Sequence, residues 1–318
     1  MNKLFLISFF IFLVQINFAQ QKINTDKKND TTVFIDNKKV TLPDVWVRNN
    51  FDYKKLLQQI KDDTTFYKAF RNLRILNFSS YNDIKMLDKN AAVKASLFSK
   101  TKQNRSDNCR TMDVLEQKVT GDFFDSKGNY NYLTPELYAG LFFTTGKVCG
   151  ENNIVKGRNL TVSNKKGLEK YKEQLKMLFF NPGKKIPGIP FIGNKLDLYD
   201  DRARKIYDYK LDIVEFQGKI CYQFSITPKD DLGLFKRDDI VIDDMTTWFD
   251  IKTLEVLARN YSLSYKTGFY SFDVSMEVEM MRIGDLMVPK VLRYKGNWDV
   301  IFKKRERAVF TATLFDFK

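Results

Sequence analysis

The sequence predicts an α+β protein in which helices cover a strongly curved antiparallel β-sheet, a half-barrel, after a mixed helical and β N-terminal region. From residue 205 onward, strand-like runs follow one another with short turns between them. One of them, YSFDVSMEVEMM (270–281), alternates apolar and polar residues and therefore has one apolar and one polar face. A sheet with one apolar face must pack that face on helices or close on itself, and amphipathic helices precede these strands.

The N-terminus has the form of a secretory signal peptide. Lys3 precedes an apolar run of eleven residues, Leu4 to Val14, and the small residue Ala19 marks the expected cleavage site. A spanning helix needs about 20 apolar residues, so this run is too short for one. No cysteine follows the run to form a lipobox. We expect residues 1–19 to be the signal, no transmembrane segment, and a periplasmic or secreted protein.

Residues 20–50 are expected to form a polar tail with two short strands around the turn Asp36-Asn37-Lys38. Residues 51–76 place apolar side chains at spacings of three and four, which predicts helices, the second capped by Asp63 or Thr64. Residues 51–160 read as a mixed α/β region, with strand-like pieces at 114–120 and 129–133. A helix is predicted over 134–143, with Thr134 as its cap and Pro135 at its first position.

Residues 161–318 are expected to form an amphipathic helix followed by a β-meander. The helix over 164–180 ends at Asn181-Pro182-Gly183, and a loop rich in proline and glycine follows it. Turns of the meander are predicted at Gln217-Gly218, Asp250–Lys252, Ile283-Gly284-Asp285 and Lys295-Gly296-Asn297. These turns predict about eight strands in one sheet.

Charge gives little guidance to partners. The chain has 53 basic and 39 acidic residues, a net charge of +14, and loss of Lys3 with the signal leaves 52 − 39 = +13. Such a balance attracts anionic envelope components such as lipid headgroups. The basic residues are spread along the chain, which solubility alone explains, and KKRER (303–307) is interpreted as a solvated strand edge. We expect no nucleic-acid binding.

Histidine is absent, which excludes Ser-His-Asp and Cys-His catalysis and His-ligated zinc. The three cysteines contain no C-x-x-C pair, so we expect no metal. An oxidising compartment permits a disulfide, and Cys109 and Cys149 are the favoured pair, with Cys221 a free buried thiol. The odd count leaves the pairing open.

No catalytic residue or cofactor is expected, and we do not expect an enzyme. GLFFTTGKV (140–148) has five residues between its glycines and Val148 where a P-loop needs Ser or Thr. Glu277 and Glu279 share one strand face at a separation that suits an inverting glycosidase, but a solvated strand face shows the same spacing. The paired aspartates of the sequence lie in or near turns and lack the spacing of a calcium loop.

Three phrases of the meander resemble the LolA/LolB-like outer-membrane lipoprotein-sorting superfamily: YDYKLDIVEFQGKICYQFSITPK, DIVIDDMTTWFDIKTLEVLARNYSLSY and GDLMVPKVLRYKG. The resemblance covers residues 205–317 and extends to secreted proteins of Gram-negative bacteria in which such half-barrels recur. It implies helices on the concave side of the sheet and acyl chains held between. Residues 20–160 and the prolines of 182–190 have no counterpart, and no family site residue carries over.

The apolar face supplies the candidate ligand-binding residues: Trp248, Phe272, Met276, Met280 and Trp298. The predicted function is a secreted, periplasmic, LolA-like protein without enzymatic activity that binds a lipid, an acyl chain or a lipoprotein. One alternative is a structural or interaction protein of the envelope whose core is fully self-packed, because an apolar sheet face is needed for folding in any case. A second alternative is a carboxylate-dependent hydrolase.

Overall fold

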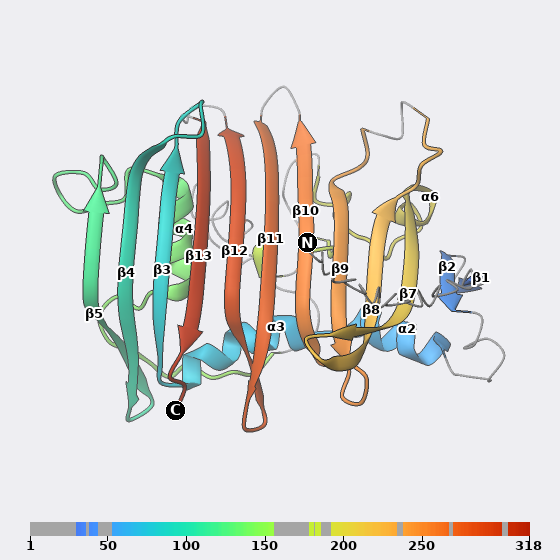
Figure 1. The fold of residues 1–318 in the computed structure, drawn as a ribbon, viewed down its shortest axis with the longest axis horizontal. Coiled ribbons are helices and arrows are strands. Elements are labelled where there is room, and N and C mark those ends of the chain that lie inside the picture. The colour runs from blue at the N-terminus through green and yellow to red at the C-terminus, as the bar shows by residue number, and fades with distance from the viewer. Residues whose placement is uncertain are drawn as a thin grey trace, which may run out of the picture.

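The computed structural model is built on one large open sheet (Figure 1). The structure describes residues 30–35, 38–43, 53–155, 178–180, 182–185, 192–233, 238–266, 270–300 and 305–318. The helices are α2 (Tyr53–Asp62), α3 (Thr65–Asn72), the 3-10 turn η1 (Leu73–Ile75), α4 (Leu133–Phe142) and α6 (Ala203–Ile206). The strands are β1 (Asp30–Ile35), β2 (Lys38–Pro43), β3 (Phe78–Leu87), β4 (Val93–Ser106), β5 (Cys109–Thr120), β6 (Val148–Cys149), β7 (Tyr207–Phe216), β8 (Lys219–Pro228), β9 (Ile242–Asp250), β10 (Val256–Lys266), β11 (Tyr270–Ile283), β12 (Leu286–Val300) and β13 (Glu306–Phe315).

The strand order is β1-β2-β7-β8-β9-β10-β11-β12-β13-β3-β4-β5-β6. The eleven strands from β7 to β6 pair antiparallel throughout, and the hairpin β1–β2 joins them through a parallel contact of β2 with β7. The last strand, β13, pairs with β3, so that Thr311 lies opposite Asp83. Strands β3 to β6 of the predicted N-terminal region therefore belong to the same sheet as the meander, and the division of the chain at residue 160 stays a prediction.

The alternation predicted for β11 is confirmed. Phe272, Val274, Met276, Val278 and Met280 are buried, and the residues between them are exposed or half-buried. We call the face that carries these five side chains the inner face and the opposite one the outer face.

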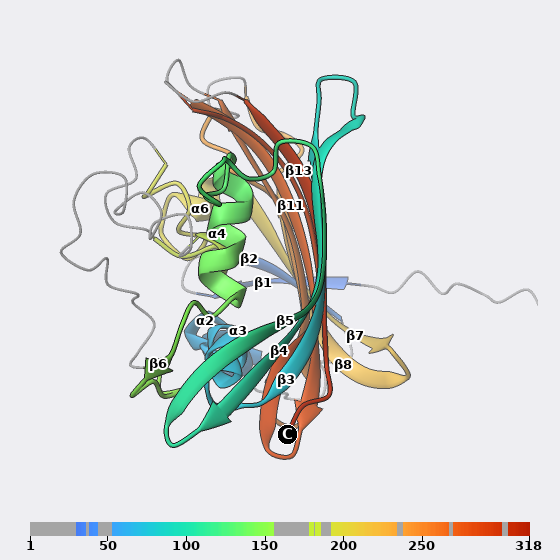
Figure 2. The same ribbon diagram turned by 90° about the vertical axis from the view of Figure 1, so that its left-hand side faces the viewer.

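Helices α3 and α4 pack against part of the inner face. Figure 2 shows the curved sheet from its side, with α2, α3 and α4 all on one side of it. Helix α3 contacts β12, and α4 contacts β13, where the rings of Tyr138 and Phe310 lie 4.8 Å apart. None of the helices in the described ranges is long and apolar enough to cross a bilayer.

Helices α2 and α3 form where the apolar spacing predicts them, and Asp63 supplies the cap. Its carboxylate accepts hydrogen bonds from the backbone N–H of Thr65 at 2.7 Å and from the Thr65 hydroxyl at 2.6 Å. The side chain of Thr64, at the N-cap position, makes no capping bond. The Thr65 hydroxyl also accepts the backbone N–H of Val256 at 3.1 Å, which joins the start of α3 to β10.

A buried ion pair fastens the same helix start to the sheet. The Arg259 guanidinium lies 3.5 Å from the Asp63 carboxylate, and both side chains are at most 10% exposed. Arg259 also donates through Nε to the Thr247 hydroxyl at 2.9 Å and stacks 4.4 Å from the Phe66 ring centroid. Burial, only partly offset by the Asp63 charge, lowers the pKa of Arg259. The attraction to Asp63 offsets part of the free energy that the guanidinium loses when it leaves water on folding.

Helix α4 forms where it is predicted, but Thr134 is not its cap. The helix begins at Leu133, and its first N–H groups are satisfied from outside the helix by the carboxylate of Glu306 on β13. The Thr134 hydroxyl donates to the same carboxylate at 2.9 Å. A carboxylate from a distant strand therefore takes the place of the local cap that the sequence suggests.

The predicted turn at Lys295-Gly296-Asn297 is wrong, because β12 continues through it to Val300. Gly296 instead makes room for the side chain of Tyr294, whose hydroxyl and ring occupy the place that a Cβ at Gly296 would take. Tyr294 stacks on Phe310 of β13 at 4.6 Å. Within the described ranges, seven strands therefore follow residue 205, one fewer than the sequence suggests.

The strand-like piece at 129–133 is also not a strand. Only an isolated bridge joins Phe124 to Tyr130, and α4 begins at Leu133. The Asp125 carboxylate accepts the backbone N–H groups of Lys127 and Asn129, which closes a turn in place of a strand. The signal peptide, most of the helix predicted over 164–180, and residues 186–191 of the proline-rich loop lie outside the described residues.

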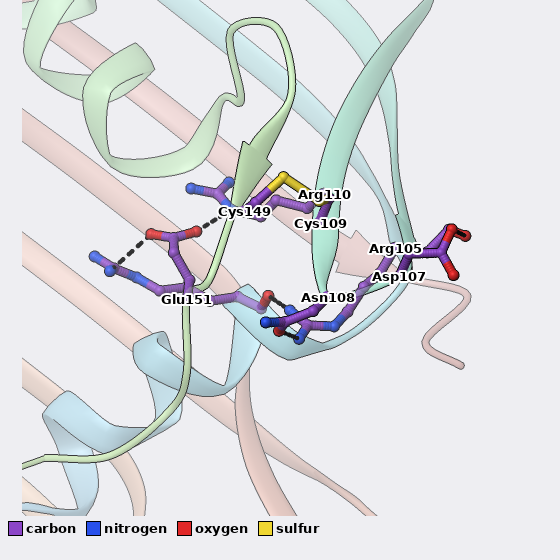
Figure 3. The surroundings of a disulfide bond; sticks show 9 residues. Arg105, Asp107, Asn108, Cys109, Arg110, Cys149 and Glu151 are labelled. Carbon is purple, nitrogen blue, oxygen red and sulfur yellow. Dashed lines mark hydrogen bonds and ion pairs between the residues drawn. A yellow bond between two sulfur atoms is a disulfide. The ribbon is translucent and has the colours of Figure 1, made fainter.

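The disulfide joins the favoured pair. Cys109 of β5 lies opposite Cys149 of β6, and the two are bonded (Figure 3). Cys221 is a buried free thiol whose pKa is raised by burial. Close to the bond, the Glu151 carboxylate accepts Nε of Arg110 at 2.5 Å and Nη1 of Arg74 at 2.9 Å. These contacts tie the segment after β6 back to the sheet and to η1.

Candidate hydrophobic binding site

An apolar cavity of about 60 Å³ lies between α4 and the inner face. Helix α4 contributes Thr134, Leu137, Tyr138 and Leu141, and residues Leu178 and Phe179 close one side. Strands β10 to β13 contribute Tyr261, Leu263, Val274, Tyr294, Trp298 and Phe310. Among the residues that the structure describes, no Lys, Arg, Asp or Glu lines the cavity.

A row of smaller residues crosses three strands of the inner face beside the cavity. Val274 of β11 is opposite Gly296 of β12, which is opposite Ala308 of β13. Directly opposite residues share a sheet face, so the three form one shallow strip of the inner face. Larger side chains stand in the rows on either side of this strip, including Tyr294 and Trp298. The side chain of Tyr294 bends over Gly296 and fills part of the strip.

The hydroxyl groups around the cavity all have partners. Tyr138 donates to Asn82 Oδ1 at 2.6 Å, Tyr261 donates to the Phe179 carbonyl at 3.0 Å, and Tyr294 accepts the indole N–H of Trp298. Burial raises the pKa of all three tyrosines, so they are neutral at every physiological pH. The wall therefore offers an uncharged surface on which an alkyl group leaves no polar atom newly unpaired.

Part of the inner face beyond β13 is polar. Side chains of β3 and β4 form a buried hydrogen-bonded group there: Ser80, Asn82, Ser99 and Thr101. Asn82 is the centre of the group and also accepts the Tyr138 hydroxyl. The polar group therefore borders the apolar surface next to Tyr138, while Ile84, Met86 and Leu97 continue that surface further along the same two strands.

The structure brings together three of the five predicted site residues. Trp298 lines the cavity. The ring centroids of Phe272 and Trp298 lie 5.4 Å apart. Met276 is on the same face and lies opposite Tyr261 and Tyr294, two residues that line the cavity. Met280 is also on the inner face, but four residues further along β11, opposite Pro289 and outside the lining.

Trp248 lies on the outer face. It is opposite Gln223 and Ala258, and Ala258 is opposite Glu279 on the polar side of β11. Its indole N–H donates to Gln223 Oε1 at 3.1 Å, and its ring stacks on Phe216 at 4.8 Å. The structure therefore separates Trp248 from the other four candidates by the thickness of the sheet.

The residues that sequence reasoning missed are those of α4 and the tyrosines Tyr261 and Tyr294. The apolar side of residues 134–143 is visible in the sequence. The position of α4 over β13 is not, because it depends on Glu306, which is 172 residues away from Thr134.

The outer-face carboxylates Glu277 and Glu279 are held by Arg293. Its Nη1 lies 2.8 Å from Glu279 Oε1 and 3.5 Å from Glu277 Oε2, and the Glu279 hydrogen bond raises the pKa of Arg293. They point away from the cavity. Within the described ranges, no group of three or more acidic or cysteine side chains is arranged to hold a metal.

The comparisons with known proteins give alignments only at low identity and low TM-score. No family model matches the chain, and no curated protein matches it. A structure described as an outer membrane lipoprotein-sorting protein domain, from Vibrio parahaemolyticus, aligns with 9% identity and a TM-score of 0.25, over 80% of this chain and 91% of that one. A DUF1329 family protein from Desulfovibrio piger aligns with 11% identity and a TM-score of 0.23, over 79% and 92%.

Proposed function

We propose that this protein is a LolA-like, non-enzymatic protein of the cell envelope that holds an acyl chain of a lipid or lipoprotein between α4 and the inner face. The observation that carries the proposal is the apolar cavity between α4 and the inner face, which Val274 and aromatic side chains line on the sheet side. A periplasmic or secreted location follows from the signal peptide predicted for residues 1–19.

The chemistry of the wall supports an alkyl ligand. Burial of each methylene group contributes about 0.8 kcal/mol, so a chain can bind usefully without any charge in the site. Aromatic rings and branched aliphatic side chains make up most of the lining, and its hydroxyl groups already have partners. An alkyl group that fits the cavity with Tyr294 in place therefore gains contacts without breaking a hydrogen bond, whereas a longer chain that displaces Tyr294 breaks the bond from Trp298.

Tyr294 gives the cavity a way to lengthen. Its side chain lies over Gly296 and is held there by one hydrogen bond to Trp298 and by stacking on Phe310. Rotation of this side chain away from Gly296 opens the strip between Val274 and Ala308. We infer that a longer chain displaces Tyr294 in this way, and that the net positive charge of the protein attracts anionic headgroups to it.

The two described tryptophans provide the test. Trp298 lines the cavity, and Trp248 lies on the other face. We expect 9,10-dibromostearic acid, whose bromine atoms quench indole fluorescence on contact, to quench Trp298. The quenching should disappear in Trp298→Phe and persist in Trp248→Phe.

A matched pair of variants on β11 tests where the chain binds. Val274→Phe fills the cavity and should abolish the quenching, whereas Ser275→Phe, at the next position and on the outer face, should leave it unchanged. Absence of quenching in the wild-type protein would favour the alternative of a self-packed envelope protein. Equal quenching of Trp248 and Trp298 would contradict a chain beneath α4.

A further inference from the structure

Strand β5 leaves most of one side of the sheet unpaired. Along its whole length it pairs with β4, but β6 pairs only with Cys109 and Arg110. Within the part of the chain that the structure describes, no strand pairs with β5 from Thr111 to Thr120. Figure 1 shows β5 as the last long strand on this side of the sheet.

This edge carries apolar side chains in an exposed position. Val114, Leu115 and Val119 are 57%, 54% and 40% exposed. Leu115 is the extra residue of a bulge between Val114, which is opposite Thr101, and Glu116, which is opposite Lys100, and the pairing with β4 is regular from Glu116 to Thr120. An open edge with apolar side chains is a template for another strand, and natural proteins commonly protect such an edge.

The charges on the edge are complementary to themselves in one register. In an antiparallel pair, two directly opposite residues are of the same hydrogen-bonding type, and this type alternates along each strand. A residue of β5 therefore cannot lie opposite its own neighbour in a second copy. The two-fold axis between two copies of β5 must pass beside one residue that is paired with the same residue of the other copy. Centred on Glu116 or on Lys118, such a pair places like charges opposite each other. Centred on Gln117, it places Glu116 opposite Lys118 twice and Leu115 opposite Val119 twice.

The sheet faces on which the β5 side chains lie are consistent with the register centred on Gln117. Val119 is opposite Leu97 of β4, on the inner face, and Lys118 is opposite Phe98, on the outer face. Pairing about Gln117 therefore joins the apolar side chains on one face and forms two ion pairs on the other. A register centred on Leu115 instead places Val114 opposite Glu116, and so it forms neither the apolar contacts nor the ion pairs.

We propose that two copies of this chain form a symmetric dimer by antiparallel pairing of their β5 edges, with Gln117 on the two-fold axis. The surface is isologous, so each copy offers the same five residues, Leu115 to Val119. The inference does not depend on the cavity or on any ligand.

Charge reversal tests the register. In the full mature protein, followed by sedimentation equilibrium, Glu116→Lys and Lys118→Glu should each raise the dimer dissociation constant by about tenfold, since each places like charges opposite twice. The double variant Glu116→Lys/Lys118→Glu should restore the wild-type constant. Lys219→Glu, an exposed reversal on β8, is the control and should change nothing.

Cross-linking provides a second measurement. Directly opposite Cβ atoms are about 4.5–5.5 Å apart, close enough for a disulfide after a small adjustment, so Gln117→Cys should cross-link to its own copy under mild oxidation. Lys118→Cys faces Glu116 in this register and should not. A wild-type protein that stays monomeric at 100 µM, or a double variant that fails to restore the dimer, would overturn the proposal.

Discussion

The carboxylate of Glu306 caps the helix that begins beside Thr134. It accepts the backbone N–H groups of Leu133 at 2.7 Å and of Thr134 at 2.9 Å, together with the Thr134 hydroxyl. Glu306 is on β13 directly opposite Trp298, so the cap lies next to the cavity. One side chain therefore fixes both the end of α4 and the position of α4 over the sheet.

We expect Glu306→Ala to lower the free energy of unfolding by about 1–2 kcal/mol, because the first N–H groups of α4 lose their acceptor. Urea denaturation measures the loss, and hydrogen exchange should show faster exchange within residues 133–142. Asp299→Ala, which removes an exposed ion pair with Arg305, is the control and should cost less than about 1 kcal/mol. Unchanged protection of α4 in Glu306→Ala would show that packing alone holds the helix.

Removal of the partner of a buried charge is expected to cost more. Asp63→Ala leaves the Arg259 guanidinium inside the protein without its carboxylate and removes the acceptor for Thr65. A loss of about 3–5 kcal/mol in the free energy of unfolding is expected. Arg293→Ala, which breaks only exposed ion pairs, should lose about 1 kcal/mol or less. Similar losses in the two variants would mean that Arg259 is solvated in solution.

Gly296→Ala should destabilise the protein by about 1–3 kcal/mol, because the new methyl group overlaps the side chain of Tyr294. The Tyr294→Leu variant removes the overlapping ring, and in that background the same substitution should cost much less. Chemical denaturation of the two single variants and the double variant gives the coupling between the sites. Additive losses would indicate that Tyr294 does not lie over Gly296.

Low pH should lower the free energy of unfolding, partly through protonation of Glu151. Burial raises its pKa, but the hydrogen bond from Arg110 and the charges of Arg74 and Arg110 outweigh burial, so the pKa lies below its ordinary value (Figure 3). A lowered pKa in the folded state means that the stabilisation is present above the unfolded value of about 4.5 and is lost as the pH falls through the folded pKa.

We therefore expect the wild-type protein to lose more stability between pH 7 and pH 3 than Glu151→Gln does. Urea denaturation at the two pH values measures the difference. Asp107→Asn, on the exposed turn between β4 and β5, is a control that should follow the wild-type protein. Equal pH dependence of Glu151→Gln and the wild type would show that these arginines do not hold Glu151 in its charged form.

Local patterns in the sequence predict most of the individual elements. The hairpin at Gln217-Gly218 forms where two alternating runs flank a turn pair, and α2 and α3 form where apolar residues recur at helical spacing. The turn predicted at Gly296 does not form, because a glycine can either end a strand or give space to a neighbouring side chain within it. Only the position of Tyr294 over Gly296 distinguishes the two cases.

By itself, the sequence determined that β11 has one apolar face, that the meander pairs antiparallel and that α4 begins near Thr134, because alternation, turn chemistry and helical spacing all act within a few residues. Only the tertiary structure decided that β13 lies beside β3, that Glu306 caps α4 and that Trp248 faces away from Phe272. The face of a strand relative to its neighbours depends on register, and a shift of one residue moves every side chain to the other side. Register across several strands, including the bulge between Val256 and Ala258, is set by packing of the whole sheet.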